Sequence, residues 1–386
     1  DTGAIKVGDK GIAFYGDNSS LNLNSSNVDI SNNGTLAYGV NGAQINYNLG
    51  NKTTSENTFI YLINSNVDFN GADITIANNG LGIYQEGASL VQGYNTLNVG
   101  DNAAGIYGFA TNVSNVGNVI VQGENAVGLI GEDSNITNNT GNVISTTSDG
   151  SVGIYSLLKA PTASTNLVNN GDLNISGDQS IGIFASTLDS TGASIGTTFV
   201  QNNNIITLGN VTGVNNATIG IFGTEGVDIL NAVGSQISGG NNVVGIYSEK
   251  GTVKHDSAIN LGDNSVGIYI SAGNATIDSG ASISVGSTGA VALYANARGT
   301  IINDSSSISV GTGSVLGYSK DSGTLLDNRG NLSIGTESVG FYSSGGEITN
   351  SGNLSSVGDG VVFFYGNNGK ITNNGQINGG RNNYGV

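Results

Sequence analysis

The single histidine, His255, is the first candidate for a catalytic residue, because it lies between Lys254 and Asp256. An imidazole beside an amine and a carboxylate has the groups that general acid–base catalysis uses. The same residues, followed by Ala258 and Ile259, also fit a polar turn before a strand, and we expect His255 to be solvated there. The chain has no Cys, which excludes thiol catalysis, Cys-ligated zinc and disulfides.

Carboxylates spaced by about one repeat are the second candidate. Asp256, Asp278 and Asp304 lie 22 and 26 residues apart, and Asp327 follows 23 residues later. If these side chains stack, they form an acidic column. We interpret such a column as a row of turn residues in preference to a metal site.

Few residues are left for enzymatic or cofactor chemistry. Polysaccharide lyases and hydrolases built on β-helices need a basic proton acceptor with a carboxylate or calcium cluster, or two carboxylates facing the scissile bond. A phosphate-binding loop is missing, because the segment from Gly366 to Lys370 is too short and Ile371 follows it. We therefore predict no enzyme activity, no metal and no cofactor. The chain contains three arginines: Arg298, Arg329 and Arg381.

Charge and chain ends narrow the class of protein further. The 386 residues include 28 acidic and 11 basic residues, a net charge of −17, so the chain has no electrostatic reason to bind nucleic acid or an anionic membrane.

There is no initiating Met and no signal-peptide pattern at the start. The last residues, 382–386, resemble an unfinished copy of the repeat described next. We interpret the chain as an excerpt of a longer protein.

One repeat runs through the whole sequence. The phrase Ser-Val-Gly-Ile-Tyr is complete at 151–155 and 265–269, and it returns at 338–342 with Phe341 in place of Ile. Fifteen copies can be aligned on their last position, most of them 22 to 25 residues apart, and 12 of the 15 tyrosines occupy that position. A period of this length is typical of solenoids.

Each repeat contains three short runs in which apolar and small polar residues alternate, separated by Asn- and Gly-rich turns. One coil cannot bury its own apolar side chains, whereas stacked coils share a continuous core. We predict an all-β fold: a single-stranded, right-handed parallel β-helix (β-solenoid) of about 15–16 coils, each ~23 residues long, with three short strands per coil. It should continue without a break over residues 1–386.

The period of two along a strand predicts which side chains face the interior. In Val-Gly-Ile-Tyr the Val and Ile share one face, so we expect Val152, Ile154, Val266 and Ile268 in the core. Gly and Tyr share the other face, and we favour an outer or corner position for the rings over a buried stack. The tyrosines should form a structural ladder that includes Tyr155, Tyr247, Tyr269, Tyr294, Tyr318 and Tyr342.

Two coils are longer than the others and predict inserted loops. Coil 156–183 has about six extra residues, and coil 185–221 has about 15. Insertions in a solenoid leave the tube as loops, which often bind partners, although neutral drift in loop length gives the same pattern. Because the two coils are adjacent, the two loops could form one joint protrusion. The candidate ligand-binding residues are Lys159, Pro161, Asp189, Thr191 and Phe199.

The recurring Ser-Val-Gly-Ile-Tyr with Asn- and Gly-rich turns resembles the passenger (β-helix) region of large type V autotransporter adhesins, most of all the fusobacterial outer-membrane autotransporters. The resemblance covers residues 11–386. It implies a signal peptide and a translocator barrel outside this chain, and a location on the bacterial cell surface, anchored at the outer membrane or extracellular. The implied partner is a protein or glycan receptor on host cells or on other bacteria.

Three functions remain open at this point. The first, which we favour, is a cell-surface adhesin segment that mediates attachment to host cells or other bacteria. The second is a purely structural stalk or spacer whose ligand site lies elsewhere. The third and least favoured is a polysaccharide-degrading β-helix enzyme.

Overall fold

The repeat folds into coils of about 24 residues, each with three parallel strands. The computed structural model describes residues 4–24, 28–31, 33–54, 56–161, 163–212 and 217–385. These residues form strands and turns and contain no helix, so none that could cross a membrane. The predicted all-β parallel β-solenoid is confirmed.

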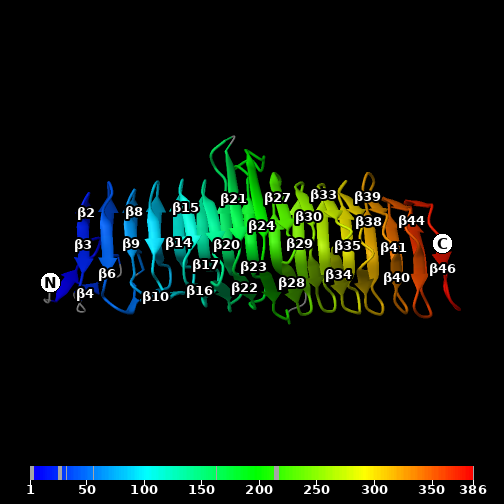
Figure 1. The fold of residues 1–386 in the computed structure, drawn as a ribbon, viewed down its shortest axis with the longest axis horizontal. Coiled ribbons are helices and arrows are strands. Elements are labelled where there is room, and N and C mark those ends of the chain that lie inside the picture. Colours follow the sequence, from blue (N-terminus) through cyan, green and yellow to red (C-terminus); the bar gives the residue numbers. More distant parts are fainter. Residues whose placement is uncertain are drawn as a thin grey trace. The chain divides into compact units, whose positions relative to one another are not determined.

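The chain divides into two compact units, Asp1–Phe184 and Ala185–Val386. Each unit repeats the same coil, and its strands run side by side in Figure 1. Strand β23 (Ile181–Ser186) contains the boundary between the units. The expectation of one uninterrupted solenoid over residues 1–386 stays a prediction.

The first face of each coil is the tyrosine sheet, named after its repeated aromatic residue. In Asp1–Phe184 it contains β2 (Ile12–Asp17), β5 (Thr35–Val40), β8 (Thr58–Ile63), β11 (Leu81–Glu86), β14 (Ala104–Phe109), β17 (Val127–Glu132) and β20 (Val152–Leu157). In Ala185–Val386 it contains β26 (Thr218–Gly223), β29 (Val243–Glu249), β32 (Val266–Ser271), β35 (Val291–Asn296), β38 (Val315–Lys320), β41 (Val339–Ser344) and β44 (Val362–Asn367).

The second face is the asparagine sheet, named after the residue that ends most of its strands. In the first unit it contains β3 (Ser20–Leu23), β6 (Gln44–Tyr47), β9 (Asn66–Asp68), β12 (Leu90–Gln92), β15 (Asn112–Asn115), β18 (Asn135–Asn138) and β21 (Ser164–Asn169). In the second unit it contains β24 (Thr197–Asn202), β27 (Val227–Asn231), β30 (Thr252–His255), β33 (Asn274–Ile277), β36 (Thr300–Asn303), β39 (Leu325–Asn328), β42 (Glu347–Asn350) and β45 (Lys370–Asn373).

The third sheet closes each coil. In the first unit it contains β1 (Ile5–Val7), β4 (Val28–Ile30), β7 (Lys52–Thr53), β10 (Asp73–Ile76), β13 (Thr96–Val99), β16 (Asn118–Val121), β19 (Val143–Thr146) and β22 (Asp172–Ile175). In the second unit it contains β25 (Ile205–Leu208), β28 (Gln236–Gly239), β31 (Ala258–Asn260), β34 (Ser282–Val285), β37 (Ile308–Val310), β40 (Leu332–Ile334), β43 (Leu354–Ser356) and β46 (Ile377–Asn378).

Strand pairing is in register with the repeat. Tyr269 pairs with Tyr247 on one side and with Tyr294 on the other. Ile268 likewise pairs with the isoleucine and leucine at the same slot of the neighbouring coils. Like side chains therefore stack on like at one strand spacing, about 4.8 Å.

The predicted core is correct for isoleucine and wrong for valine. Ile154 and Ile268 are fully buried, whereas Val152 and Val266 are half-buried on the outer face. The strict alternation fails because Gly267 and Ile268 are both buried in succession. A Cβ on Gly267 would lie 2.6 Å from the carbonyl oxygen of Ala292 in the next coil, so the backbones approach too closely for most side chains.

A buried serine precedes each outward valine in many coils. Ser151, Ser265 and Ser338 are 0–1% exposed. The Ser151 hydroxyl donates to the Gly123 carbonyl at 2.7 Å, and Ser265 Oγ accepts the backbone N–H of Val243 at 3.2 Å. The serine is thus a fixed inward position, and it explains why the residue after it faces outward.

The interior of the asparagine sheet holds ladders of amide side chains. In the first unit Asn115 Nδ2 donates to Asn138 Oδ1 at 2.7 Å, and Asn138 donates to Asn169 at 2.8 Å. In the second unit Asn303 donates to Asn328 at 2.7 Å and Asn328 to Asn350 at 2.6 Å. All six side chains are fully buried. Each amide thus satisfies the next, which removes the cost of burying a polar group.

We predict that Asn328→Ala lowers the free energy of unfolding by about 2–3 kcal/mol. The substitution leaves the Gly330 carbonyl and the Asn350 amide oxygen without the donor that each has now, at 2.9 and 2.6 Å. Urea unfolding of the purified chain measures the loss. The matched control is Asn260→Ala at an exposed position of β31, and an equal loss in both variants would contradict the ladder's role.

Candidate functional surfaces

The tyrosine ladder lies on the outer face of the tyrosine sheet, with its rings half-buried. In the first unit Tyr38 stacks on Tyr61 at a centroid distance of 4.7 Å, and Tyr61 stacks on Tyr84 at 4.2 Å. Tyr155 packs against Phe184 at 5.0 Å, with the rings tilted by 56°. The outer placement matches the favoured expectation.

The second unit has a ladder of its own. The rings of Tyr247, Tyr269 and Tyr294 stack nearly parallel at 4.6 Å spacings. Tyr318 and Tyr342 continue the row with edge-to-face contacts at 4.9 and 4.7 Å. Most ring faces are covered by a neighbouring ring, so the ladder presents mainly ring edges and hydroxyls to solvent.

Several tyrosine hydroxyls donate to a glutamate. Tyr84 donates to Glu86 at 2.9 Å, and Tyr107 donates to Glu132. Burial raises the pKa of both tyrosines well above the usual value of 10, and these hydrogen bonds raise it further. In the second unit, burial and the Glu249 charge raise the pKa of Tyr247 to about 12. The hydroxyls therefore stay protonated and uncharged at physiological pH.

We predict that Tyr269→Phe changes the free energy of unfolding by less than about 1 kcal/mol, because the lost hydroxyl accepts only a part-exposed bond from Asn296 Nδ2 at 3.0 Å. Tyr269→Ala should cost about 1–3 kcal/mol, because it removes the ring between Tyr247 and Tyr294. Urea unfolding measures both losses. Equal losses would show that the hydroxyl, and not the ring, stabilises the ladder.

The outward valines form a second apolar row beside the tyrosines. In the second unit Val244, Val266 and Val291 pair in register, and Val315 and Val339 continue the row; all five are half-buried. Two inward residues separate each valine from its tyrosine. The outer face of this sheet therefore carries two parallel apolar rows.

The first inserted loop joins β20 to β21 and is held against the neighbouring coil. Lys159 Nζ forms an ion pair with Glu132 Oε2 at 2.8 Å. The backbone N–H groups of Lys159 and Ala160 donate to Asp133 Oδ1 at 2.6 and 2.7 Å. Lys159 and Pro161 are both exposed. The loop thus has a fixed base and an accessible tip.

The second inserted loop, 187–196, joins β23 to β24. Asp189 and Thr191 are exposed, but Asp189 Oδ1 accepts the Thr191 backbone N–H and hydroxyl at 2.8 and 2.7 Å, so both residues shape the loop itself. Phe199 lies outside the loop, in β24, where it pairs with Asp228 and is 37% exposed. The prediction that Phe199 belongs to the inserted loop is therefore wrong, and the joint protrusion stays a prediction.

The structure corrects the prediction for His255, which is fully buried at the end of β30. It occupies the slot that asparagine fills in other coils: Asn231 Nδ2 lies 3.1 Å from His255 Nδ1, and Nε2 lies 3.2 Å from the Ser282 carbonyl. Because a carbonyl only accepts, Nε2 carries the proton and Nδ1 accepts from Asn231. Burial lowers the pKa of His255 to about 4.

We predict that the neutral imidazole of His255 stabilises the fold at neutral pH and that this contribution is lost in acid. Its pKa is about 6.5 when unfolded and about 4 when folded, so the unfolded chain binds more protons between these values. The contribution is complete above about pH 6.5 and is lost as the pH falls toward 4. The Asp278 charge, which also faces the imidazole, opposes this loss.

The measurement is the free energy of unfolding at pH 7 and at pH 4, for the wild type and for His255→Asn. Asparagine continues the ladder without a titrating group, so the variant controls for the titration of the carboxylates elsewhere in the chain. The wild type should lose up to about 3 kcal/mol more than the variant over this interval. Equal losses would contradict the account.

The acidic column exists, but one member is misplaced. The backbone N–H groups of Asp256, Asp278 and Asp304 each donate to the preceding coil at 2.9–3.0 Å, immediately after the buried slot. Arg329 takes the fourth place, because its N–H donates to Asn303. Asp327 lies two residues earlier, within β39. The coils of this region differ in length, so the spacing of the aspartates along the sequence does not reveal this shift of two residues.

Two basic side chains pair with the carboxylates of this region. Lys254 Nζ contacts Asp256 at 2.6 Å and Asp278 at 3.0 Å, and Arg329 contacts Asp304 and Asp327 at 3.6 and 2.8 Å. Burial raises the pKa of Asp256, whereas hydrogen bonds from Asp256 and Lys254 lower the pKa of Asp278. No cluster of three or more metal-ligating side chains occurs among the described residues.

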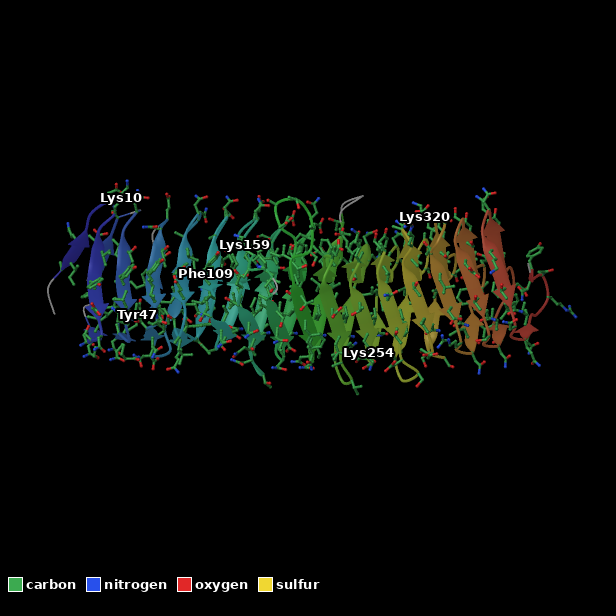
Figure 2. The ribbon with its side chains drawn as sticks, turned by 90° about the horizontal axis from the view of Figure 1, so that it is seen from above. Lys10, Tyr47, Phe109, Lys159, Lys254 and Lys320 are labelled. Atoms are coloured by element: carbon green, nitrogen blue, oxygen red, sulfur yellow. The ribbon has the colours of Figure 1, made fainter. Side chains whose placement is uncertain are left out.

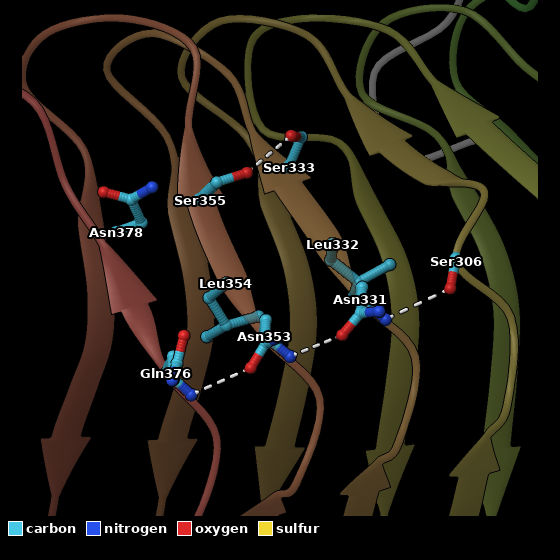
Figure 3. A pocket seen from close by; sticks show the side chains of 9 residues that line it. All are labelled: Ser306, Asn331, Leu332, Ser333, Asn353, Leu354, Ser355, Gln376 and Asn378. Carbon is cyan, nitrogen blue, oxygen red and sulfur yellow. Dashed lines mark hydrogen bonds between the residues drawn. The ribbon is translucent and has the colours of Figure 1, made fainter.

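A polar groove of about 400 Å³ lies over β40, β43 and β46 (Figure 3). Asn331 Oδ1 accepts the Asn353 backbone N–H at 2.8 Å, and Asn353 Oδ1 accepts that of Gln376 at 3.1 Å. Ser333 and Ser355 share a hydroxyl hydrogen bond of 2.8 Å. The amide groups hold successive coils together and leave an uncharged, hydrogen-bonding surface.

Comparison with known proteins adds no relative. The chain matches no protein-family model, and it matches none of the curated proteins. The class that the structure defines is therefore a parallel β-solenoid with a stacked aromatic ladder on one outer face.

Proposed function

We propose that this chain is a passenger segment of a cell-surface autotransporter adhesin and that the outer face of its tyrosine sheet takes part in attachment to host cells or other bacteria. The observation that carries the proposal is the pair of half-buried valine and tyrosine rows on that face. A contiguous apolar surface of this kind on a solvent-exposed sheet is typical of interaction sites.

The third sheet provides the contrast within the same coils. Its outward positions carry exposed polar residues such as Ser284, Ser309 and Ser333. Stacking of coils alone therefore does not require apolar residues on an outer face. The valine and tyrosine rows need a further reason, and binding to a partner supplies one.

A structural spacer is the second candidate. The regular amide ladders and the mutually covered tyrosine rings support it, because both stabilise coils without any ligand. In that case the receptor-binding site lies in another part of a longer protein. An enzyme acting on polysaccharide has less support, because the paired carboxylates Asp256 and Asp278 are both bound to Lys254.

Attachment of bacteria and host cells to a surface coated with the chain tests the proposal. The face variant is Val266→Thr with Val291→Thr, which keeps β-branched side chains and adds hydroxyls. The loop variant lacks residues 188–195; its ends are close, since Ile195 N–H donates to the Thr187 carbonyl at 3.0 Å. The control is Ser284→Ala on the third sheet.

We expect the face variant to reduce attachment several-fold relative to the control, with unchanged far-ultraviolet circular dichroism. A loss in the loop variant alone would move the binding surface to the inserted loop. Full attachment in both variants, or none in the wild type, would favour the spacer.

A further inference from the structure

The ladder contains two runs in which every tyrosine lies beside another tyrosine. The run of the first unit consists of Tyr15, Tyr38, Tyr61, Tyr84 and Tyr107, each the register partner of the next. The run of the second unit consists of Tyr247, Tyr269, Tyr294, Tyr318, Tyr342 and Tyr365. Within both runs the centroids of neighbouring rings are 4.2–5.8 Å apart. Each phenol therefore packs against another phenol.

A residue without a phenol ends the first run. Ile130 is the register partner of both Tyr107 and Tyr155, so it separates Tyr155 from the run. On its other side Tyr155 packs against Phe184. Tyr155 thus occupies the same half-buried position on the sheet as the other ladder tyrosines but has no tyrosine beside it.

Carboxylates beside some of these rings can take up the phenolic proton. The Tyr84 hydroxyl donates to Glu86 at 2.9 Å, and the Tyr247 hydroxyl lies 3.5 Å from Glu249 Oε1. Burial raises the pKa of both tyrosines, so each phenol still carries its proton at neutral pH. A phenol loses an electron more easily when this proton leaves at the same time, because no charged radical forms. A carboxylate already bonded to the hydroxyl favours that step.

We propose that the tyrosine ladder is a site of oxidative modification, at which hydrogen peroxide and a haem peroxidase join neighbouring tyrosines into dityrosine. Each ring loses one electron to the peroxidase and its phenolic proton to a carboxylate or to water. The two radicals form one C–C bond between ring carbons adjacent to the hydroxyls, and the hydrogens of those carbons move to the phenolic oxygens. The pair thus loses two hydrogen atoms in total, which reduce one hydrogen peroxide to two water molecules.

The register decides which tyrosines can join. Register partners have Cα atoms about 4.8 Å apart, whereas tyrosines two coils apart are separated by about 10 Å and by the ring between them. Coupling therefore joins only adjacent coils. The rings of Tyr61 and Tyr84 are the closest in the first run, at 4.2 Å, and Tyr84 has Glu86 as its proton acceptor. We expect this pair to give the main product of the first unit.

Cross-links of this kind give the chain a covalent reinforcement that disulfides cannot supply, because it has no Cys. Each bond closes a loop of about one coil and so restricts the unfolded chain, as a disulfide does. Thiols do not reverse the bond. Oxidation should therefore raise the urea concentration at which the chain unfolds. The inference goes beyond attachment, since it concerns the stability of the coils themselves.

The test is treatment of the full chain with a haem peroxidase and hydrogen peroxide, followed by dityrosine fluorescence and mass-spectrometric mapping of the joined peptides. We expect cross-links within single molecules and only between register partners. Urea unfolding of the product, compared with the untreated chain, measures the reinforcement.

Three tyrosines are internal controls in the same sample. Tyr47, which is labelled in Figure 2, is fully buried and contacts Phe59 and Phe69. Tyr384 lies outside the ladder and is the most exposed tyrosine, at 65%. Tyr155 has the ladder position without a tyrosine neighbour. All three should stay uncoupled, whereas Tyr384 would react first if exposure selected the product.

Two substitutions should change the products in opposite directions. Ile130→Tyr places a phenol between Tyr107 and Tyr155 and should add cross-links to both, a gain that misfolding cannot produce. Tyr269→Phe should remove the cross-links to Tyr247 and Tyr294 without creating one between those two.

A third substitution tests the proton acceptor. Glu86→Gln keeps an oxygen that accepts the Tyr84 hydrogen bond but cannot take up the proton. It should lower the yield of the Tyr61–Tyr84 product several-fold relative to the products of the second unit in the same sample. The matched control is Glu124→Gln, at an exposed glutamate outside the ladder, and it should leave this ratio unchanged.

Dityrosine formed mainly between molecules, or mainly at Tyr384, would overturn the proposal, as would hydroxylated tyrosine without coupling. Photochemical oxidation with a ruthenium complex, run on the folded chain and in concentrated urea, separates register from sequence. The folded chain should give register partners and the unfolded chain mixed pairs at lower yield. The same products in both would contradict the proposal, and an unchanged urea midpoint after cross-linking would overturn the reinforcement.

Discussion

The strands of each coil satisfy their backbone hydrogen bonds with the coils on either side, and this constraint decides much of the rest of the structure. Parallel strands at one spacing place every residue beside its counterpart in the neighbouring coil. A residue is therefore favoured where it can pack against, or bond to, its counterpart in the next coil. Isoleucine, asparagine, serine and tyrosine all meet this condition, each by a different contact.

The same constraint makes charged residues costly, and it shows where the chain tolerates them. Like charges in one column repel, and in the second unit Lys254 and Arg329 pair with the carboxylates of the acidic column. The glutamates of the first unit's outer face are instead separated by Phe109 and bonded to tyrosine hydroxyls. His255 lies inside the core in a slot that asparagine fills in other coils, and burial lowers its pKa.

Much of the fold follows from the repeat, because a period shared by 12 tyrosines leaves little freedom for another topology. The wrong core position of the valines has one cause: strict alternation predicts an outward Gly267, whereas Gly267 and Ile268 are both buried. The buried serine before the valine was the available signal. Phrases such as Asn169-Asn170-Gly171 indicated turns correctly, yet their first residue lies in the buried ladder.

The candidate surfaces were harder to predict than the fold. The sequence identified the tyrosine row and the two long coils, but it could not show that Lys159 reaches Glu132 or that Phe199 lies in a strand. Those relations depend on which residues of neighbouring coils meet, and an error of one residue in a turn changes them. Asp327 shows the effect, since a shift of two residues replaces it with Arg329 in the acidic column.

In-register stacking is the central claim, and cysteine pairs test it most directly, because the chain has no native Cys. Thr252 and Asn274 are exposed register partners, so their Cα atoms should lie about 4.8 Å apart, within the range that a disulfide needs. Thr252 and Thr276 are offset by two residues and should lie about 8 Å apart, which is too far. The account predicts rapid oxidation of Thr252→Cys with Asn274→Cys and almost none of Thr252→Cys with Thr276→Cys. Equal oxidation of both pairs, or a preference for the second, would contradict it.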